Sequence, residues 1–368
     1  MITSEAAEGR QRIAVLGATG SIGTQALAVI DNFPHRFELF AAVSGRQRCD
    51  RPARYVLTGQ SPDFEARLEE IVTHPECDTV LVAIPGAASL RPTLAALEAG
   101  KRVALASKEV LVMAGDLVMA RASQDQLLPV DSEHSALWQC MWGEARENVA
   151  RLLLTASGGP FWGSPDLNWE KVSVAQALAH PRWSMGPKVS IDSATMVNKA
   201  LELIEAHYLF QVPLEQIEVV IHPQSVIHSM VEFIDGSSKA QLGNPDMRLP
   251  IGLALAYPRR LPGLVPSTIF NQLEALEMFP LDGRRFPAVD LARNAALLGP
   301  PYPAIFNAAD EEAVTAFLNH RLPFSGIVRL IDSALAAYPG ASSPSATCSL
   351  GEILEADQWA RDHVRARI

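Results

Sequence analysis

A short acidic motif at residues 131–134 has the composition of a divalent-metal site. Asp131 and Glu133 follow an apolar run, and their separation of two residues places both carboxylates on one side of an extended chain. Two hard oxygen donors then converge, which suits a hard metal cation. The alternative interpretation is that Asp131 or Ser132 caps the N-terminus of a helix, which requires no metal.

A polar stripe lies on a long helix that the sequence predicts after Ser193, the expected N-cap. Such a stripe is usually a solvated face, but a neutral Asn beside Lys and Glu is unlike an ordinary ladder of ion pairs. The stripe can therefore serve a phosphate and a metal together. The polar face holds Thr195, Asn198, Lys199, Glu202 and Glu205, and the opposite face holds Met196, Val197, Leu201 and Ile204.

Near the N-terminus, three glycines predict a dinucleotide site. The apolar segment RIAVL runs into Gly17, Gly20 and Gly23, and a helical segment follows. Glycine lets the backbone approach a pyrophosphate, and the helix N-terminus supplies N–H groups and the positive end of its dipole. The position at the start of a βαβ series favours cofactor binding over a purely structural turn.

The end of the second predicted strand indicates which dinucleotide is bound. An NAD site usually has Asp or Glu there for the ribose hydroxyl, whereas this chain reads Ser-Gly-Arg-Gln-Arg at residues 44–48. Arg46 and Arg48 suit a 2′-phosphate. A solvated turn is the alternative, but the missing acid independently favours NADP.

These residues need a scaffold, and the apolar pattern predicts one of the α/β class. In residues 12–129, the strand-like segments RIAVL, FELFAAV, TVLVAI and RVALAS alternate with helical stretches, which predicts a parallel, Rossmann-type sheet covered by helices. Beyond it, VARLLLTAS, EVVIHP and SVIHSMVEFI are strand-like within mixed elements. The predicted division is an NADPH-binding domain (1–130), an α+β catalytic domain that binds metal and substrate (131–256), a connecting segment (257–289) and a small helical C-terminal domain (290–368).

Composition limits the classes of partner and compartment. The chain has 368 residues, 48% of them hydrophobic, and a net charge of −10, so nucleic acid is an unexpected main partner. Its four cysteines are widely spaced and form no CxxC motif, which favours a reducing cytoplasm. No apolar run approaches the roughly 20 residues that span a bilayer, so no membrane association is expected. Residues 1–11 are polar and lack the layout of a secretory signal, which predicts a short disordered tail.

Together, these motifs closely resemble the 1-deoxy-D-xylulose 5-phosphate reductoisomerase family. The resemblance spans most of the chain and is weakest in the C-terminal helical part, where FNAADEEAV carries it. Besides the glycine turn, the matching stretches are LASKEVLV, PVDSEH, TASGGPF, HPRWSMGPK, IDSATMVNKALE, HPQSVIHSMVEF and AQLGNPDMR.

The resemblance implies a role for each matching residue. Asp131, Glu133 and Glu202 would bind one Mg²⁺ or Mn²⁺, and with Lys108 and His180 they form the expected catalytic set. The substrate phosphate would be held by Ser157, Ser193, Asn198 and Lys199, and the substrate shell would be completed by Lys108, Ser132, Glu133, His180, Trp183, Met185 and Glu202. NADPH would be bound by Gly17, Thr19, Gly20, Ser21, Ile22, Gly23, Gly45, Arg46, Gln47, Ser107, Glu109 and Gly186.

The implied reaction rearranges 1-deoxy-D-xylulose 5-phosphate to a bound aldehyde, which NADPH reduces to 2-C-methyl-D-erythritol 4-phosphate, an isoprenoid precursor. Because the aldehyde must stay bound, a lid is expected: Trp183 and Met185 would cover the site, with hinges at Pro181, Gly186 and Pro187. The resemblance also implies a homodimer, and SVIHSMVEFI can serve either the sheet or the interface. The alternative interpretations are that residues 157–160 form a plain turn, that His180 is structural and that Trp183 is a core residue.

The chain also departs from the family pattern. Ser107 replaces the usual Asn of LANKESLV, Gln47 replaces an Asn near the adenine, and Pro85 and Ser89 interrupt AIVGAAGL. These changes bear on cofactor affinity more than on the chemistry. Two other functions are consistent with the glycine turn alone: an NADP-linked dehydrogenase without rearrangement, and a nonenzymatic NADP sensor. The set of Asp131, Glu133, Lys199 and Glu202 argues against both.

Overall fold

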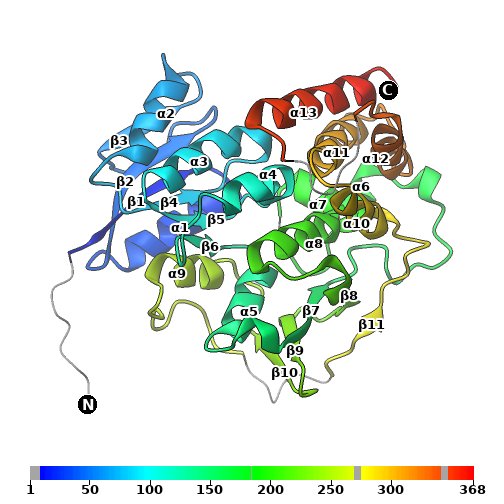
Figure 1. Ribbon diagram of the computed structural model, residues 1–368, viewed down its shortest axis with the longest axis horizontal. Helices are drawn as coiled ribbons and strands as arrows, with labels where there is room; N and C mark the ends of the chain where they lie inside the picture. Colours follow the sequence, from blue (N-terminus) through cyan, green and yellow to red (C-terminus); the bar gives the residue numbers. More distant parts are fainter. Residues whose placement is uncertain (1–8, 184, 269–274, 341–346) are drawn as a thin grey trace. The chain divides into compact units, whose positions relative to one another are not determined.

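The computed structural model describes residues 9–183, 185–268, 275–340 and 347–368, so part of the predicted tail lies outside the described residues (Figure 1). Within these ranges the chain forms two compact units. Unit 1 comprises residues up to Ser107, Arg121–Asp131 and Asp246–Val265, and unit 2 comprises Lys108–Ala120, Ser132–Pro245 and Pro266–Ile368. This division by contacts differs from the linear division drawn above, which stays a prediction.

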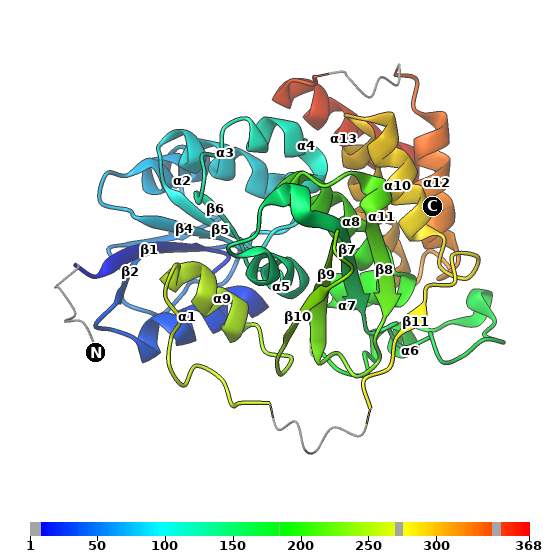
Figure 2. The same ribbon diagram turned by 60° about the horizontal axis from the view of Figure 1, so that its bottom comes forward.

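Unit 1 contains a six-stranded parallel sheet in the order β3-β2-β1-β4-β5-β6, which confirms the predicted Rossmann-type fold. Helices α1 and α9 pack together, as do α2 and α3, and the two pairs lie on opposite faces of the sheet (Figures 1 and 2). Since both faces are covered, the strands read as apolar runs. The elements are β1 (Gln11–Leu16), α1 (Ser21–Asn32), β2 (Phe37–Ser44), β3 (Tyr55–Thr58), α2 (Phe64–Thr73), β4 (Thr79–Val82), η1 (Gly86–Ser89), α3 (Leu90–Glu98), β5 (Arg102–Leu105), β6 (Leu127–Pro129) and α9 (Arg248–Ala256).

Unit 2 combines a five-stranded mixed sheet, in the order β10-β9-β7-β8-β11, with a group of helices. Every strand predicted from the apolar pattern is present in the two sheets, and β9, from the SVIHSMVEFI segment, lies inside this one. Its elements before the C-terminal helices are α4 (Glu109–Met119), α5 (Ser132–Met141), η2 (Arg146–Asn148), β7 (Val149–Ala156), η3 (Trp169–Lys171), α6 (Val174–Leu178), α7 (Pro187–Thr195), α8 (Val197–Phe210), η4 (Leu214–Gln216), β8 (Ile217–Ile221), β9 (Ile227–Phe233), β10 (Ser238–Leu242) and β11 (Phe279–Pro280).

The C-terminal region is helical, as predicted, and it belongs to the core of unit 2. Its buried side chains join those of β7, β8 and α8 in one hydrophobic cluster, so the sheet and these helices are stabilised together. The four helices are α10 (Ala288–Leu298), α11 (Tyr302–Leu318), α12 (Gly326–Ala337) and α13 (Leu350–Arg365).

Two local predictions were wrong. The motif at residues 131–134 is not extended, because α5 begins at Ser132 and places Glu133 in its first turn. The long helix predicted after Ser193 is two helices, since Met196 has a φ of 65° and ends α7 before α8 begins. At the break, the Thr195 hydroxyl accepts a hydrogen bond from the Val197 N–H, at 3.3 Å. Ser193 therefore lies in the last turn of α7 and does not cap the helix.

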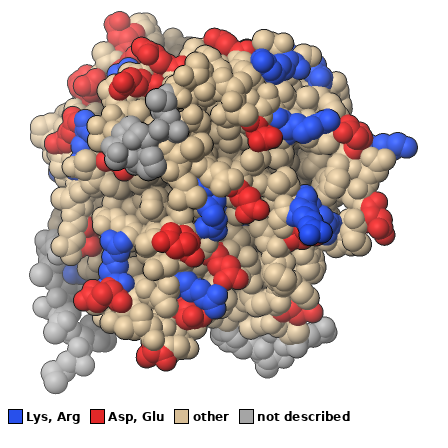
Figure 3. Space-filling view, turned by 45° about the vertical axis from the view of Figure 1, so that its right-hand side comes forward, with Lys and Arg blue, Asp and Glu red and all other residues tan. Residues whose placement is uncertain are grey.

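Among the helices of the described ranges, none is both long and apolar enough to cross a bilayer. On the face shown in Figure 3, Lys and Arg side chains lie among Asp and Glu side chains, without a continuous basic surface for a nucleic-acid backbone.

The turn between β1 and α1 leads to a testable prediction about folding. A Cβ at Gly23 would lie 2.1 Å from the Gly17 carbonyl oxygen and 2.7 Å from the Ala18 Cα, both rigid backbone atoms. We expect Gly23→Ala to lower the free energy of unfolding in urea by about 1–3 kcal/mol, as overpacking does. The matched control is Gly45→Ala, whose Cβ would meet nothing within 4 Å. Equal stability of the two variants would contradict the packing argument.

Candidate active site

The glycine turn in unit 1 is shaped by close backbone approaches. Gly17 has a φ of 90°, and a Cβ there would lie 2.3 Å from the Ala83 carbonyl oxygen. Its N–H donates to the Val43 carbonyl at 2.8 Å, which joins the turn to β2. Gly20 is the N-cap of α1 and provides no side-chain cap, so the first-turn N–H groups can bind an external anion. The turn residues Thr19, Gly20, Ser21 and Ile22 are exposed or partly exposed.

The predicted 2′-phosphate segment follows β2 at the same edge of the sheet. Gly45, Arg46, Gln47 and Arg48 are exposed, and the Gly45 carbonyl accepts the Gly59 N–H at 2.8 Å. The backbone of this turn is therefore held while its cationic side chains reach solvent. This arrangement agrees with either interpretation, a solvated turn or a phosphate site.

Two departures from the family pattern have structural roles. The Ser107 hydroxyl is buried and donates to the Ile84 carbonyl at 2.6 Å, which links the segments after β4 and β5. The Ser89 hydroxyl donates to the Gly86 carbonyl at 2.6 Å within η1. Both hydroxyls thus stabilise the chain's own backbone. Of the other predicted cofactor residues, Glu109 and Gly186 lie in unit 2.

The predicted metal ligands come together. Asp131 directly precedes α5, Glu133 is in its first turn and Glu202 is on α8, and each offers a carboxylate oxygen within 4.8 Å of the others. Ser132 donates its hydroxyl to Glu133, which fixes that carboxylate. Three carboxylates from different directions are the hard-oxygen set that Mg²⁺ or Mn²⁺ binds, so the residues fit such an ion.

Two lysines and an asparagine surround these carboxylates. Lys199 Nζ contacts Glu133 Oε1 at 2.8 Å and also contacts the second oxygen of Glu202. Lys108 Nζ lies 2.9 Å from Glu202 Oε1 and 3.0 Å from Asn198 Oδ1. Asn198 also donates to Glu202 at 2.5 Å. Two predicted metal ligands, Glu133 and Glu202, and two predicted phosphate-binding residues, Asn198 and Lys199, therefore belong to one hydrogen-bonded group.

Two members of this group on α8 are buried, which excludes a fully solvated polar stripe. Lys199 is 4% exposed and Glu202 is 1% exposed. Burial alone would lower the pKa of Lys199, but the charges of Glu133 and Glu202 outweigh burial and raise that pKa. Lys199 is therefore a permanent cation.

The predicted phosphate turn and His180 also meet. Gly158 and Gly159 both have positive φ, and a Cβ at Gly159 would lie 2.6 Å from the Ser193 carbonyl oxygen. Only glycine allows this turn to pack on the end of α7. Ser157 Oγ lies 3.0 Å from His180 Nε2, so the turn also contacts the segment before α7.

The contacts of His180 define its tautomer. Its Nδ1 accepts the N–H groups of Arg182, at 3.2 Å, and Trp183, at 2.8 Å. The proton of the neutral ring is then on Nε2 and is donated to Ser157. Burial lowers the pKa of His180, which favours this neutral form.

The expected lid segment is hydrogen-bonded to His180 through the Trp183 N–H. Trp183 is half-buried and lies outside the hydrophobic cluster formed by the described residues of unit 2, so it is not a core residue. Its ring centroid is 6.3 Å from that of His228. Met185 is also partly exposed, and Gly186 is the N-cap of α7.

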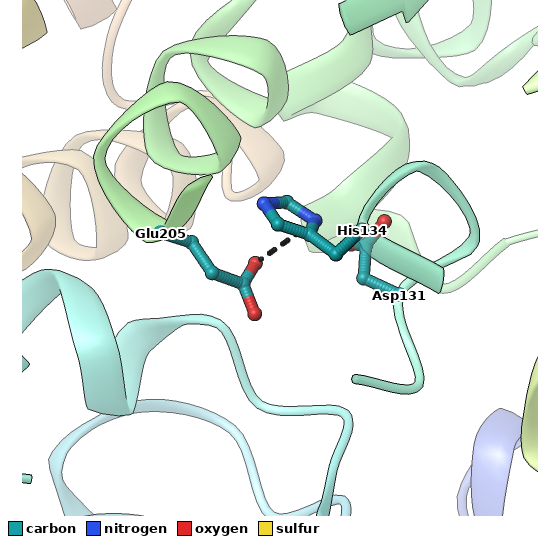
Figure 4. Close-up of side chains that lie close together, drawn as sticks. All are labelled: Asp131, His134 and Glu205. Atoms are coloured by element: carbon teal, nitrogen blue, oxygen red, sulfur yellow. Dashed lines mark ion pairs between the residues drawn. The ribbon is translucent and has the colours of Figure 1, made fainter. Parts of the chain in front are cut away.

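The structure pairs two residues to which the sequence assigned no individual role. His134 and Glu205 point toward one another (Figure 4), with 3.4 Å between His134 Nδ1 and Glu205 Oε2. His134 Nε2 lies 3.0 Å from the backbone carbonyl of Glu202, so this pair supports the helix that carries a predicted ligand. With Asp131 they form a second group that could hold a metal ion. The signal was present, because His134 adjoins Glu133 and Glu205 shares the polar face of Glu202.

Comparison with known proteins identifies the family. Three profiles match: 1-deoxy-D-xylulose 5-phosphate reductoisomerase over residues 13–56 and 56–115, its C-terminal domain over residues 127–210, and the DXP reductoisomerase C-terminal domain over residues 242–363. The reductoisomerase of Mycobacterium marinum is 48% identical across 100% of this chain and 95% of its own length. That of Pelotomaculum thermopropionicum is 46% identical across 96% of this chain and 97% of its own length.

Solved structures of reductoisomerases match this chain in fold as well as in sequence. The reductoisomerase of Zymomonas mobilis in complex with NADPH has a TM-score of 0.86 and 38% identity, covering 98% of this chain and 99% of that one. A reductoisomerase in complex with NADPH, fosmidomycin and magnesium has a TM-score of 0.88 and 38% identity, covering 97% and 98%. Because sequence and fold agree along the whole chain, it belongs to the 1-deoxy-D-xylulose 5-phosphate reductoisomerase family.

Proposed function

We propose that this chain catalyses the NADPH- and divalent-metal-dependent conversion of 1-deoxy-D-xylulose 5-phosphate to 2-C-methyl-D-erythritol 4-phosphate, a step of the non-mevalonate isoprenoid pathway. The observation that carries the proposal is the ion-paired group of Glu133, Lys199, Glu202 and Lys108, with Asp131 beside it. A dehydrogenase that does not rearrange its substrate would explain the glycine turn but not this set of acids. Relatives named as reductoisomerases of this substrate, one of them solved with NADPH, fosmidomycin and magnesium, support the proposal.

The metal would be held by Asp131, Glu133 and Glu202. When bound, Mg²⁺ or Mn²⁺ supplies a Lewis acid that polarises the substrate oxygens and stabilises negative charge on them. The protein's own contribution is to place two ammonium groups beside these acids. Lys199 contacts Glu133 and Glu202, and Lys108 contacts Glu202.

The substrate phosphate would be bound by Lys199 and Asn198 of α8 together with Ser157 and Ser193. Lys199 brings a fixed positive charge, and the other three bring amide or hydroxyl donors. The packing of Gly159 on the Ser193 carbonyl supports a shared site for the two serines. His180 keeps Ser157 oriented and, being neutral, adds no charge that would compete with Lys199. Lys108, Ser132 and His180 complete the shell around the sugar.

NADPH would bind along the carboxyl edge of the unit 1 sheet. The pyrophosphate would lie at Gly17–Gly23 on the N-terminus of α1, and the 2′-phosphate at Gly45, Arg46 and Gln47. Ser107, Glu109 and Gly186 are the other proposed contacts. When bound, NADPH supplies the hydride that reduces the rearranged aldehyde.

The segment from Pro181 to Pro187 would close over the bound aldehyde. Trp183 and Met185 would exclude water, and Gly186 would act as the hinge at the start of α7. The hydrogen bond from the Trp183 N–H to His180 supports this proposal, because His180 also contacts Ser157 of the phosphate turn and would link closure to phosphate binding.

We also propose a cytoplasmic homodimer. Strand β10 forms one edge of the unit 2 sheet, and residues Ser238–Lys239–Ala240 on it are exposed. An exposed edge strand presents unpaired backbone groups to a second copy. Sedimentation velocity would test the assembly, and a monomer at working concentration would contradict it.

The central experiment is NADPH oxidation with 1-deoxy-D-xylulose 5-phosphate, with and without Mg²⁺, followed by identification of the product. We expect oxidation that stops with a chelator, resumes with Mg²⁺ and yields 2-C-methyl-D-erythritol 4-phosphate. Oxidation that proceeds equally without metal would overturn the assignment.

A substitution at Glu202 tests the metal site directly. Glu202→Gln keeps the shape of the side chain but removes the charge, so we expect kcat to fall by at least about 100-fold, since several kcal/mol of charge stabilisation depend on the ion. Mn²⁺ affinity, measured by electron paramagnetic resonance, should fall as well. The control is Glu215→Gln at an exposed position of η4. Unchanged Mn²⁺ binding in the Glu202 variant would remove it from the ligand set.

Arg46 tests the choice of cofactor. We expect Arg46→Ala to raise the KM for NADPH about tenfold, the value of one charge-assisted hydrogen bond, and to leave the KM for NADH unchanged. Arg67→Ala, at an exposed position of α2, is the matched control. An equal effect on both cofactors would show that Arg46 does not read the 2′-phosphate.

A further inference from the structure

A second buried charge cluster lies in unit 2, apart from the proposed metal ligands. Lys188 in the first turn of α7 contacts two carboxylates: Asp192 Oδ2 on the same helix, at 2.6 Å, and Asp310 Oδ2 on α11, at 2.8 Å. Asp192 is 2% exposed and Asp310 is fully buried. One ammonium therefore serves two acids that have little access to water.

The two acids cannot both be ionised at low cost. Asp192 Oδ1 and Asp310 Oδ1 are buried and have no hydrogen-bond partner among the described residues. Burial, followed by the charge of Asp310, raises the pKa of Asp192 well above its ordinary value, and burial likewise raises the pKa of Asp310. Two carboxylates in one dry site characteristically retain a proton between them.

The surrounding helices add negative charge. Glu109, the first residue of α4, faces Lys188 and Asp192, and burial raises its pKa as well. Glu311 of α11 lies near Asp310 but is paired with Arg361 of α13 at 2.6 Å.

Charged groups on the other helices packed on α7 or α11 have partners of their own or are exposed. On α8, Lys199 pairs with Glu202 and Glu205 pairs with His134. Helix α6 has no charged residue, and Asp290 of α10 and Asp332 of α12 are exposed. Arg293 of α10 donates to backbone carbonyls, and Arg329 of α12 pairs with Glu170. Among the described residues, Lys188 is the cation in ion-pair contact with both acids.

We propose that Asp192 and Asp310 share one proton, and that the resulting pair, balanced by Lys188, is a positioning group that anchors α7 on α11. Both ends of α7 matter for the proposed reaction. Gly186 and the lid segment immediately precede its first turn, and Ser193 of the phosphate site immediately follows Asp192. The positioning role rests on the proposed function, whereas the shared proton does not.

A shared proton gives the fold a defined pH dependence. Because the pKa of the pair is raised in the folded state, folding takes up a proton above the unfolded pKa of about 4. The stabilisation is complete below that value and is lost as pH rises through the raised pKa. At high pH, two negative charges meet across the α7–α11 contact.

Asp310→Asn tests the proton, because Asn keeps the shape and supplies a permanent N–H donor to Asp192. We expect the variant to match wild type in urea unfolding near pH 6 and to exceed it at pH 9, where its stability should no longer fall. The control is Asp332→Asn, an exposed position on α12. Infrared spectroscopy should show the carbonyl stretch of a protonated carboxylic acid in wild type and lose that band in Asp310→Asn. Absence of the band from wild type, or an unchanged pH dependence in the variant, would overturn the shared proton.

Asp310→Ala tests the positioning role. Removing the anchor should raise the KM for 1-deoxy-D-xylulose 5-phosphate about tenfold, with a smaller change in kcat and in the KM for NADPH, whereas Asp310→Asn should restore the wild-type value. A wild-type KM in the Ala variant would overturn the positioning role alone. If even the wild-type protein does not turn over this substrate, the proposed function fails, and the infrared and unfolding measurements still decide the proton.

Discussion

The contact of Lys199 with Glu133 and Glu202 is the constraint on which the proposed active site depends. It joins the first turn of α5 to α8, where Glu202 is buried and would be costly to keep charged without a cation. Lys108 adds a second cation from the residue before α4. The arrangement thus brings together three separate parts of unit 2, and the same charges that hold these parts in place are the ones that the chemistry requires.

Much of this arrangement could be predicted from the sequence, because its signals are local. The glycines at 17, 20 and 23 imply a strand, a tight turn and a helix, and the Gly17 φ and the packing of Gly23 supply the physical reason. The polar face with Asn198, Lys199 and Glu202 was also readable, since helical periodicity alone aligns these residues. Its burial was not readable, because the pattern does not say which other helices cover a face.

The errors arose where tertiary contacts overrule periodicity. Met196 is an apolar residue in a helical pattern, and no neighbouring residue type predicts its left-handed conformation. That conformation is accompanied by the burial of Met196 and by the hydrogen bond from the Val197 N–H to the Thr195 hydroxyl. The extended geometry assumed for Asp131 and Glu133 failed because α5 begins between them. His134 and Glu205 were visible as residue types, but their pairing joins two helices far apart in the sequence. Such long-range pairs cannot be deduced from one sequence.

The left-handed residue Met196 also fixes the number of residues that can lie between the end of α7 and the polar face of α8. An α-helix turns by about 100° per residue, so losing or gaining one residue between the Gly159 contact and Lys199 would rotate the whole face of α8 by more than a quarter turn. Glu202 would then take the place of Leu201 or of Leu203, both of which are buried in the apolar interior. Chain length here is therefore as restricted as residue identity, and evolutionary insertions should be confined to the loops outside α7 and α8.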